Sequence, residues 1–396
     1  MINFQLSLPT RIVFGPGRLD ALGDIAAEFG SRALIVSYAQ PGPLKATISK
    51  ARELLRAAGI EVVCYEAIEP NPHHDTCDSG AELLRESGCD MIVAIGGGSA
   101  IDASKAISAA AANDKSCWEF CRRPGGLAPI EAAVPIIAIP TTAATGSEAN
   151  GEAVISNPHT HEKCVLASSL VAPRVAVCDP KLHLSIPREA TADGCVDIIS
   201  HCLESYLSGE NDCALQDRLT EGVMNTVFEW GPVAVEDGGN LRARRELQYA
   251  SLWGISDLIH SGRGGSWLMH NIEHAISGHY DIPHGRGMAI VIPRVLREVF
   301  LENAPERLAQ LGKRCFGLQG GEVRESASEA VRAFVGWLGG VGRDLSLGDV
   351  GIGDEQFEAM AEDIIRNDGD GRCYHSVVKL DRAALVRILE ACLRRN

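Results

Sequence analysis

The chain has 396 residues, of which 45% are hydrophobic and 22% are charged, and its formal net charge is −15. This length exceeds what one hydrophobic core usually supports, so we expect two domains. The acidic balance argues against nucleic acid or an anionic membrane surface as a partner, although local backbone dipoles can still hold a phosphate-bearing cofactor. No apolar run approaches the length needed to span a bilayer.

The cysteines and the first residues favour a cytoplasmic protein. The chain has 13 cysteines, and no two of them form a C-x-x-C pair. The opening residues MINFQLSLPTRIVF lack the basic segment and long apolar core of a signal peptide. We therefore expect reduced thiols in a soluble cytoplasmic enzyme.

The first half of the chain alternates between short apolar runs and helical patterns. Nearly continuous β-branched runs between helices are typical of a parallel α/β sheet. After a strand and turn at residues 11–17, the expected strands are 32–37, 60–65, 91–95, 135–139 and 175–178, and the expected helices are 44–58, 76–87 and 100–112.

The pattern changes near Asp179, after which the strands stop and long amphipathic helical patterns run almost to the end. Three prolines, Pro173, Pro180 and Pro187, mark the transition. We therefore expect an α/β domain of residues 1–182 and an all-α domain of residues 183–396.

A glycine-rich turn follows the run at 91–95. It reads Gly96-Gly97-Gly98-Ser99 and leads into a helix that contains Asp102 and Lys105. Glycines at a strand-to-helix turn allow close backbone approach, and the amides at a helix N-terminus favour an anion. This is how a dinucleotide pyrophosphate is held, but the spacing is not G-x-G-x-x-G. A tight turn with Ser99 as N-cap would give the same residues.

A loop rich in hydroxyl groups follows the next run. It extends from Pro140 to Glu148 and includes Thr141, Thr142 and Ser147. At the carboxyl end of a parallel strand these side chains would face the crevice where such sheets bind ligands. The alternative is a Thr-rich capping turn.

Four side chains in the second half suggest a metal site. Asp197 and His201 are four residues apart in an apolar helical run, so they share one face of a buried helix. His270 lies on a second expected helix, and His284 lies in the turn after it. An unpaired buried carboxylate is costly, and one carboxylate with three imidazoles suits divalent Fe or Zn with a position left open. The alternative is ordinary hydrogen bonding within the core.

These motifs together resemble the iron-dependent (group III) alcohol dehydrogenase family. The resemblance lies in GGGSAIDASK, PTTAATGSE, DIISH and HNIEHAISGHYDIPHG, and it covers essentially the whole chain. The last motif further resembles the butanol dehydrogenase-like, NADPH-dependent aldehyde reductase branch.

The resemblance implies a dinucleotide-binding α/β domain, a helical domain and an active site in the interdomain cleft. It also implies a homodimer formed through the N-terminal strand. The implied metal ligands are Asp197, His201, His270 and His284. The implied cofactor-binding residues are Gly96, Gly97, Gly98, Ser99, Asp102, Thr141, Thr142, Ser147 and Lys163. One departure is Ala144, where the family commonly has glycine.

The chemistry expected of such a site is hydride transfer between a nicotinamide and a small alcohol or aldehyde. A divalent metal, with Fe²⁺ favoured and Zn²⁺ as the alternative, would lower the pKa of an alcohol or polarise a carbonyl. His274 shares a helix face with His270, and we expect it to support the ligands from outside or to relay a proton. The alternative for His274 is a packed histidine bonded to a backbone carbonyl.

The nucleotide preference depends on the segment after the second strand. NAD selectivity commonly uses an acidic residue there, but residues 37–42 read SYAQPG and contain none. The absence of an acid favours NADP(H) over NAD(H). The NADPH-linked branch has a different, glycine-rich segment at this place.

Other functions account for part of the sequence pattern. His270-Asn271-Ile272-Glu273-His274 matches the H-x-x-E-H pattern of a zinc metalloprotease, but that hypothesis leaves the glycine turn, the hydroxyl loop and Asp197 unexplained. Dehydroquinate synthase-like lyases and glycerol-type polyol dehydrogenases share the architecture, and a binding-only role would also preserve the fold. The Asp-x-x-x-His pair and the HGRGMAIVIP segment favour the alcohol dehydrogenase line.

Overall fold

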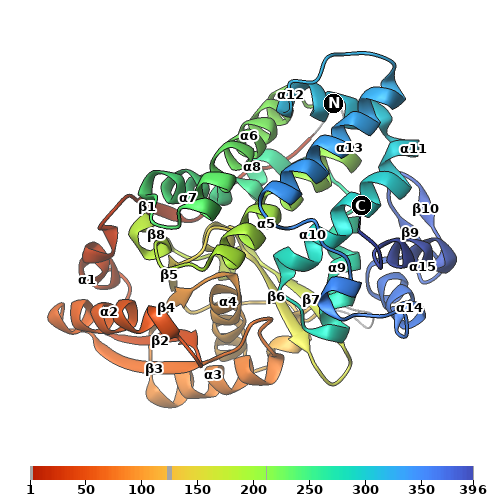
Figure 1. Ribbon diagram of the computed structural model, residues 1–396. Coiled ribbons are helices and arrows are strands. Elements are labelled where there is room, and N and C mark those ends of the chain that lie inside the picture. The colour runs from red at the N-terminus through yellow and green to blue at the C-terminus, as the bar shows by residue number, and fades with distance from the viewer. Residues whose placement is uncertain (1–2, 123–126, 211, 396) are drawn as a thin grey trace. The chain divides into compact units, whose positions relative to one another are not determined.

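A computed structural model describes residues 3–122, 127–210 and 212–395 (Figure 1). The chain forms two compact units. The sheet unit contains Ser7–Pro187 and Gly238–Leu252, and the helical unit contains Arg188–Asp237 and Trp253–Asn396 together with the start of the chain through Leu6. Residues 238–252 come after the expected domain boundary at residue 182, yet they pack with the sheet unit.

The sheet unit is built on six parallel strands. Their order is β1 (Arg11–Phe14), β8 (Val175–Cys178), β5 (Ile136–Pro140), β4 (Met91–Gly96), β2 (Arg32–Tyr38) and β3 (Glu61–Ile68). Each expected strand is present, with its bounds shifted by at most a few residues. Such a sheet is buried on both faces, which explains why its strands are apolar without alternation.

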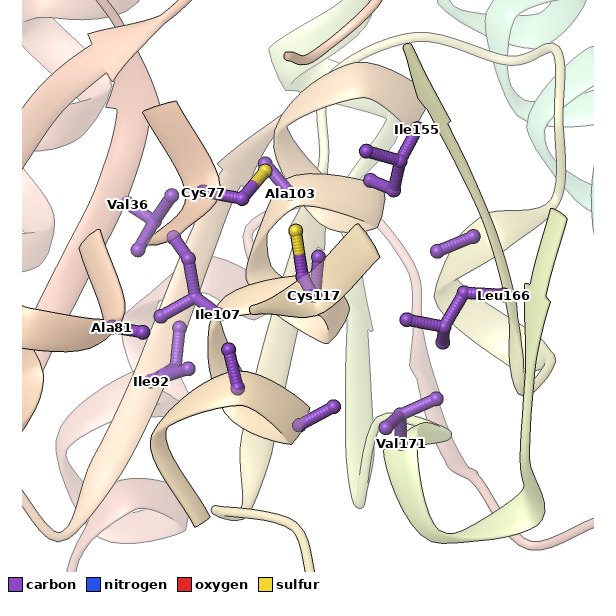
Figure 2. Close-up of a cluster of buried hydrophobic side chains, with 14 of the residues drawn as sticks. Val36, Cys77, Ala81, Ile92, Ala103, Ile107, Cys117, Ile155, Leu166 and Val171 are labelled. Carbon is purple, nitrogen blue, oxygen red and sulfur yellow. The ribbon is translucent and has the colours of Figure 1, made fainter. Parts of the chain in front are cut away.

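Helices cover both faces of this sheet. Alternate residues of each strand point to opposite faces, so Leu34 and Val36 enter one core while Ala33 and Ile35 enter the other. The first core is closed by α3 (His74–Ser87) and α4 (Gly98–Asn113), and Figure 2 shows Ala81 and Ile107 of these helices packed with Ile92 of β4. The second core is closed by α1 (Leu22–Ala26) and α2 (Lys45–Ala57).

The strand order places a topological switch between β2 and β4. From β2 the chain moves outward to β3, then returns to the other side of β2 to form β4 and β5. Ligands of open parallel sheets bind at the carboxyl ends of the strands beside such a switch. Here those carboxyl ends carry Tyr38 and Gly96.

A hairpin extends the α3/α4 side of this unit. It consists of β6 (Glu152–Asn157) and β7 (Glu162–Ala167), which pair antiparallel. In Figure 2 its residues Ile155 and Leu166 point toward α4. The hairpin is tied to α4 by Val154, whose N–H donates to the carboxylate of Asp102 at 2.9 Å.

One helix reaches the sheet unit from much later in the chain. Helix α7 (Leu241–Gly254) places Tyr249 edge-on against Phe14 of β1, with ring centroids 5.3 Å apart. Its Gln248 bonds the ring of His183 at 3.0 Å. These contacts explain why residues 238–252 belong to the sheet unit.

The helical unit is organised around α5 (Arg188–Ser208). Every residue of this helix from Thr191 to Leu207 is buried, as the apolar pattern predicts. Its companions are α6 (Ala214–Glu236), α8 (Asp257–His260), α9 (Leu268–Tyr280), α10 (His284–Val295), α11 (Leu301–Asn303), α12 (Pro305–Cys315), α13 (Val323–Gly340), α14 (Phe357–Asp368) and α15 (Arg382–Ala391).

One detail of this unit differs from the expectation of an all-α domain. The unit is not entirely helical, because β9 (Tyr374–His375) and β10 (Lys379–Leu380) form a two-residue antiparallel pair. So short a pair carries no periodicity that a sequence pattern could reveal.

None of the helices within the described residues combines the length and apolarity needed to cross a membrane.

Candidate functional site

Four side chains from three helices converge in the helical unit. The possible ligand atoms of Asp197, His201 and His270 all lie within 4.8 Å of one another. His284 joins them, because its Nε2 is 3.4 Å from Asp197 Oδ1. The Nε2 of His201 is 3.9 Å from the same oxygen. The structure therefore brings the four expected ligands together.

Helix geometry explains how distant residues meet here. Asp197 and His201 are one turn apart on α5, and His270 lies on the first turn of α9. His284 is the first residue of α10, whereas the sequence pattern placed it in the turn before this helix. Gly285 lets α10 approach α5 closely, because a Cβ there would stand 2.1 Å from the backbone oxygen of Asp193.

The donor set fits a divalent cation. Asp197 is 2% exposed, and the imidazoles of His201 and His284 lie within ion-pair distance of its carboxylate. Burial lowers the pKa of His201 well below its ordinary value, and the neighbouring histidines lower it further. A neutral imidazole keeps a lone pair for a metal, and a buried carboxylate gains most from a nearby positive charge.

Two further carboxylates, missed by the sequence analysis as parts of this site, lie behind the histidines. Glu204 Oε1 is 2.9 Å from His270 Nδ1, and Glu273 contacts His284 Nδ1. Both glutamates are fully buried. The signal for Glu204 was its place three residues after His201, on the same helix face, and Glu273 was considered only as a protease base.

His274 lies beside the ligands. Its ring centroid is 6.2 Å from that of His270 and 5.7 Å from that of His284. Its possible ligand atom also groups with those of Glu273 and His284 within 4.8 Å. The one-turn spacing from His270 thus places His274 next to the four converging residues.

Trp267 also lies beside the histidines. Its ring centroid is 5.1 Å from His270, 5.5 Å from His260 and 6.3 Å from His201. Its backbone has φ of 53°, an uncommon left-handed conformation for a bulky residue. Such strain is kept only where the surroundings impose it, here at the residue that precedes α9.

In the sheet unit, the glycine turn lies at the switch between β2 and β4. The N–H of Gly97 donates to the hydroxyl of Tyr38 at 3.1 Å, which joins the ends of the two strands. A Cβ on Gly97 would stand 2.5 Å from Thr142 Oγ1, and a Cβ on Gly98 would stand 2.6 Å from the methyl of Thr145. The glycines therefore allow the turn and the hydroxyl loop to pack together.

Helix α4 begins directly at this turn. Its first residue is Gly98 and its N-cap is Gly97, so Ser99 lies inside the helix and the interpretation of Ser99 as N-cap is wrong. The first amides of α4 are left without helical partners at the carboxyl edge of the sheet, an arrangement that suits a phosphate.

The more buried residues of this region form hydrogen bonds with one another, with the hydroxyl loop and with the hairpin. Asp102 accepts hydrogen bonds from Ser147 Oγ and from Val154 N–H, and Lys105 Nζ donates to Ser147 Oγ at 2.7 Å and to Asn150 Oδ1 at 3.0 Å. Lys105 is fully buried, and burial lowers its pKa to about 8. Together these bonds fix the hydroxyl loop and the hairpin to α4.

Two other expected cofactor residues lie at the same region. Thr141 is buried directly after β5, and its N–H donates to the backbone oxygen of Gly96 at 2.9 Å. Lys163 lies on β7 opposite Ser156. Burial raises the pKa of Asp102, whereas the charges of Lys105 and, more weakly, Lys163 oppose this rise.

The geometry argues against the protease hypothesis. In that hypothesis Glu273 would act as a base on a water molecule. Instead its carboxylate is fully buried and contacts Ser277 Oγ and His284 Nδ1. A glutamate held in this way orients a histidine and is not presented to a substrate.

Comparisons with known proteins agree across the whole chain. Residues 9–180 match the profile of the iron-containing alcohol dehydrogenases, and residues 191–393 match that of the C-terminal part of the Fe-containing alcohol dehydrogenase family. The NADH-dependent butanol dehydrogenase A of Clostridium acetobutylicum is 34% identical over 370 residues, which is 93% of this chain and 94% of that protein. The NADPH-dependent aldehyde reductase YqhD of Escherichia coli is 30% identical over 362 residues, or 91% of this chain and 92% of that protein.

Solved structures give the same result. The crystal structure of the NADH-dependent butanol dehydrogenase A from Thermotoga maritima superposes with a TM-score of 0.93 at 30% identity, covering 100% of this chain and 99% of that one. The crystal structure of YqhD from Escherichia coli superposes with a TM-score of 0.89 at 27% identity, covering 99% of each chain.

Proposed function

Because the chain belongs to the iron-containing alcohol dehydrogenase family, we propose that it interconverts a small alcohol and its aldehyde by hydride transfer to or from NAD(P)(H). The observation that carries this proposal is the convergence of Asp197, His201, His270 and His284 in the helical unit. Matching relatives are named for butanol, 1,3-propanediol, choline and aldehydes, which supports a small alcohol or aldehyde as the substrate.

We propose that these four residues hold one divalent metal, with Fe²⁺ favoured and Zn²⁺ as the alternative. When bound, the cation supplies Lewis acidity toward the substrate oxygen. The chain itself supplies three imidazoles and one carboxylate, a set that leaves room for that oxygen. Its buried surroundings exclude water and strengthen the electrostatic contacts.

His274 is the proposed proton carrier. Its ring lies beside those of His270 and His284 but is only partly buried, so it could exchange protons with solvent. In alcohol oxidation the hydroxyl proton must leave as the carbon gives up hydride, and an imidazole suits this task near neutral pH.

The proposed nucleotide site comprises the glycine turn Gly96–Gly98 with Ser99, and Thr141 and Thr142 of the hydroxyl loop. The first amides of α4, which have no partner within the helix, support a pyrophosphate there. Because Asp102 and Ser147 bond inward, we propose that they shape this loop, and that Lys163 approaches the nicotinamide half.

We propose that the segment after β2 admits the 2′-phosphate of NADP(H). Ser37 is buried and bonds the backbone of Ile95, so the residues available to the ribose are Ala39 and Gln40, neither of which is acidic. Named relatives include both NADH-dependent and NADPH-dependent enzymes. The ratio of kcat/KM for NADPH and NADH measures the preference directly, and a ratio well below one would overturn this part of the proposal.

The deciding experiment follows oxidation of NADPH and NADH with a panel of short aldehydes. The protein is stripped of metal with a chelator and reloaded separately with Fe²⁺ or Zn²⁺. Activity that returns only with metal supports the proposal and ranks metals and nucleotides together. Aldehyde-dependent turnover in the stripped protein would refute the metal site, and silence without nucleotide binding would refute the reaction.

We also propose a cytoplasmic homodimer. None of the 13 cysteines, all of which lie in the described residues, forms a disulfide, which suits a reducing compartment. Near the N-terminus Phe4, Leu6 and Leu8 expose 53%, 39% and 51% of their surface. A row of exposed apolar side chains at alternate positions suits pairing with a second copy.

A further inference from the structure

Glu204 contacts both the backbone and the ring of His270. The Oε1 atom of Glu204 accepts a hydrogen bond from the His270 N–H at 2.9 Å and lies 2.9 Å from His270 Nδ1. The glutamate is fully buried on α5, the helix that also carries Asp197 and His201. A single carboxylate oxygen therefore connects α5 to the third expected ligand.

The backbone contact replaces a missing helix cap. The first four N–H groups of a helix have no internal partner, and His270 is the third residue of α9. Trp267, the N-cap residue of α9, makes no side-chain cap bond. The carboxylate of Glu204 accepts a hydrogen bond from this N–H and is favoured by the helix dipole. It therefore fixes the position of His270 in the first turn of α9.

Glu273 has the corresponding place behind His284. Its Oε2 contacts His284 Nδ1 and its Oε1 accepts from Ser277 Oγ, while its side chain is fully buried. This contact connects α9 to the first residue of α10. By contrast, Nδ1 of His201 is buried and has no hydrogen-bond partner among the described residues.

The chemistry of the two contacts sets the tautomer of each histidine. An ionised carboxylate can only accept hydrogen bonds, so the Nδ1 atoms of His270 and His284 must carry the protons. The Nε2 atoms then keep their lone pairs. For His284 this is the nitrogen that faces the site, because its Nε2 is 3.4 Å from Asp197 Oδ1. The Nε2 of His270 lies 3.4 Å from the hydroxyl of Ser200 on α5.

We infer that Glu204 and Glu273 are positioning residues for the metal: each holds one histidine ligand in the Nδ1–H tautomer and raises its basicity through a buried carboxylate–imidazole bond. The inference rests on the proposed function, because it requires that a metal binds at the four converging residues. Partners of this kind influence metal affinity without touching the metal.

A purely structural role makes a different prediction. If the glutamates only joined helices, glutamine would replace each one with little change, because its oxygen also accepts hydrogen bonds. In a positioning role the negative charge matters, since bonds to an ionised acceptor are about twice as strong as neutral ones. Glutamine should then lower metal affinity while leaving the fold stable.

The chain offers a matched control on the same helix. His279 of α9 also pairs with a carboxylate, with its Nε2 2.8 Å from Asp363 Oδ2. His279 lies more than two helical turns after His270 on α9, and its partner Asp363 lies on α14. Asp363→Asn and Asp363→Ala therefore remove the same kind of bond outside the proposed site.

The experiment compares Glu204→Gln, Glu204→Ala, Glu273→Gln and Glu273→Ala with the two Asp363 variants and the unmodified protein. Each is stripped of metal, and Zn²⁺ and Co²⁺ affinities are measured by competition with a chromophoric chelator. The visible spectrum of bound Co²⁺ reports ligand geometry. Melting of the metal-free proteins and titration with nucleotide report the fold.

We expect both alanine variants to bind metal about 10–100-fold more weakly than the unmodified protein. The glutamine variants should show a smaller loss with an altered Co²⁺ spectrum, and the Asp363 variants should bind as the unmodified protein does. If an alanine variant does not fold, the corresponding glutamine variant decides.

Unchanged affinity and an unchanged Co²⁺ spectrum in the folded Glu204 and Glu273 variants would overturn this inference while leaving the proposed function intact. Equal losses in the Asp363 variants would also overturn it, because the effect would then not be local to the site. Failure of the unmodified protein to bind Zn²⁺ or Co²⁺ would overturn the proposed function itself.

Discussion

Gly287 of α10 lies directly against the carboxylate of Glu273. A Cβ on Gly287 would come within 2.7 Å of both Cγ and Oε1 of that glutamate. Such a distance is shorter than real Cβ contacts allow, so the absence of a side chain at 287 gives Glu273 its place beside His284. The second glycine of the HGRG segment is therefore explained by the space that Glu273 needs and not by the conformation of α10.

Gly287→Ala is therefore expected to displace Glu273 and weaken metal binding. A displaced carboxylate no longer holds the Nδ1–H of His284, so the loss should be on the order of tenfold, as for direct loss of such a partner. Chelator competition with Zn²⁺ measures it. The control is Gly336→Ala on α13, where a Cβ meets nothing within 4 Å and alanine should stabilise the helix by about 0.5–1 kcal/mol. Wild-type affinity in the Gly287 variant would contradict the expectation.

Asp197→Ala and His270→Ala are each expected to abolish turnover while nucleotide binding persists. The two residues belong to the helical unit, whereas the glycine turn belongs to the sheet unit. NADPH oxidation with a short aldehyde measures turnover, and quenching of protein fluorescence by NADPH measures nucleotide binding. A variant that lost its metal yet kept full activity would refute the proposed role of the site.

Residues that repeat a local pattern were predictable from the sequence. Apolar runs predicted the strands, and a helical run that is apolar on nearly all sides predicted the buried helix α5. The four converging residues follow from one i, i+4 pair and two histidines in one motif. These features depend on neighbours in sequence or on residue types with few other uses.

Features that depend on tertiary packing were not predictable. Glu204 looks like any helical glutamate until α9 places His270 beside it. Asp102 and Ser147 match cofactor motifs, but the fold turns them toward each other. Helix α7 packs with the sheet unit although its sequence resembles the helices around it. In each case the decisive partner is distant in sequence, so no local pattern records it.

Glu148 gives the sheet unit a pH-dependent stability. Burial raises its pKa to about 7 from an ordinary value of 4.5, and it faces Lys105, Asp102 and the thiol of Cys178. A raised pKa in the folded state means that stability is fully present below pH 4.5 and is lost as the pH rises through about 7. The protonated carboxyl is the form that the fold prefers.

Glu148→Gln is expected to remove much of this loss and to stabilise the protein at pH 8 by about 2–3 kcal/mol. Asp102, whose pKa is also raised, acts in the same direction and keeps part of the slope. Urea denaturation at pH 5 and pH 8 measures both ends. Glu53→Gln on the exposed side of α2 is the control and should retain the slope of the unmodified protein. An unchanged slope in Glu148→Gln would refute the assignment.

The N-terminal segment is expected to hold the proposed dimer together. Phe4, Leu6 and Leu8 alternate with Gln5 and Ser7, so in an extended conformation they share one face. Their exposure, 53%, 39% and 51%, leaves apolar surface that a second copy could cover. Backbone pairing between two such segments would add hydrogen bonds to this apolar contact.

The triple change Phe4→Ser, Leu6→Ser and Leu8→Ser should therefore convert the dimer to a monomer at micromolar concentration. Sedimentation velocity measures the change, and circular dichroism confirms that the fold persists. Leu215→Ser is the control, because Leu215 is 71% exposed but belongs to the start of α6. A triple variant that sediments as the unmodified dimer would move the interface elsewhere, and an unmodified protein that sediments as a monomer would exclude the dimer, since the exposed row would then have no partner.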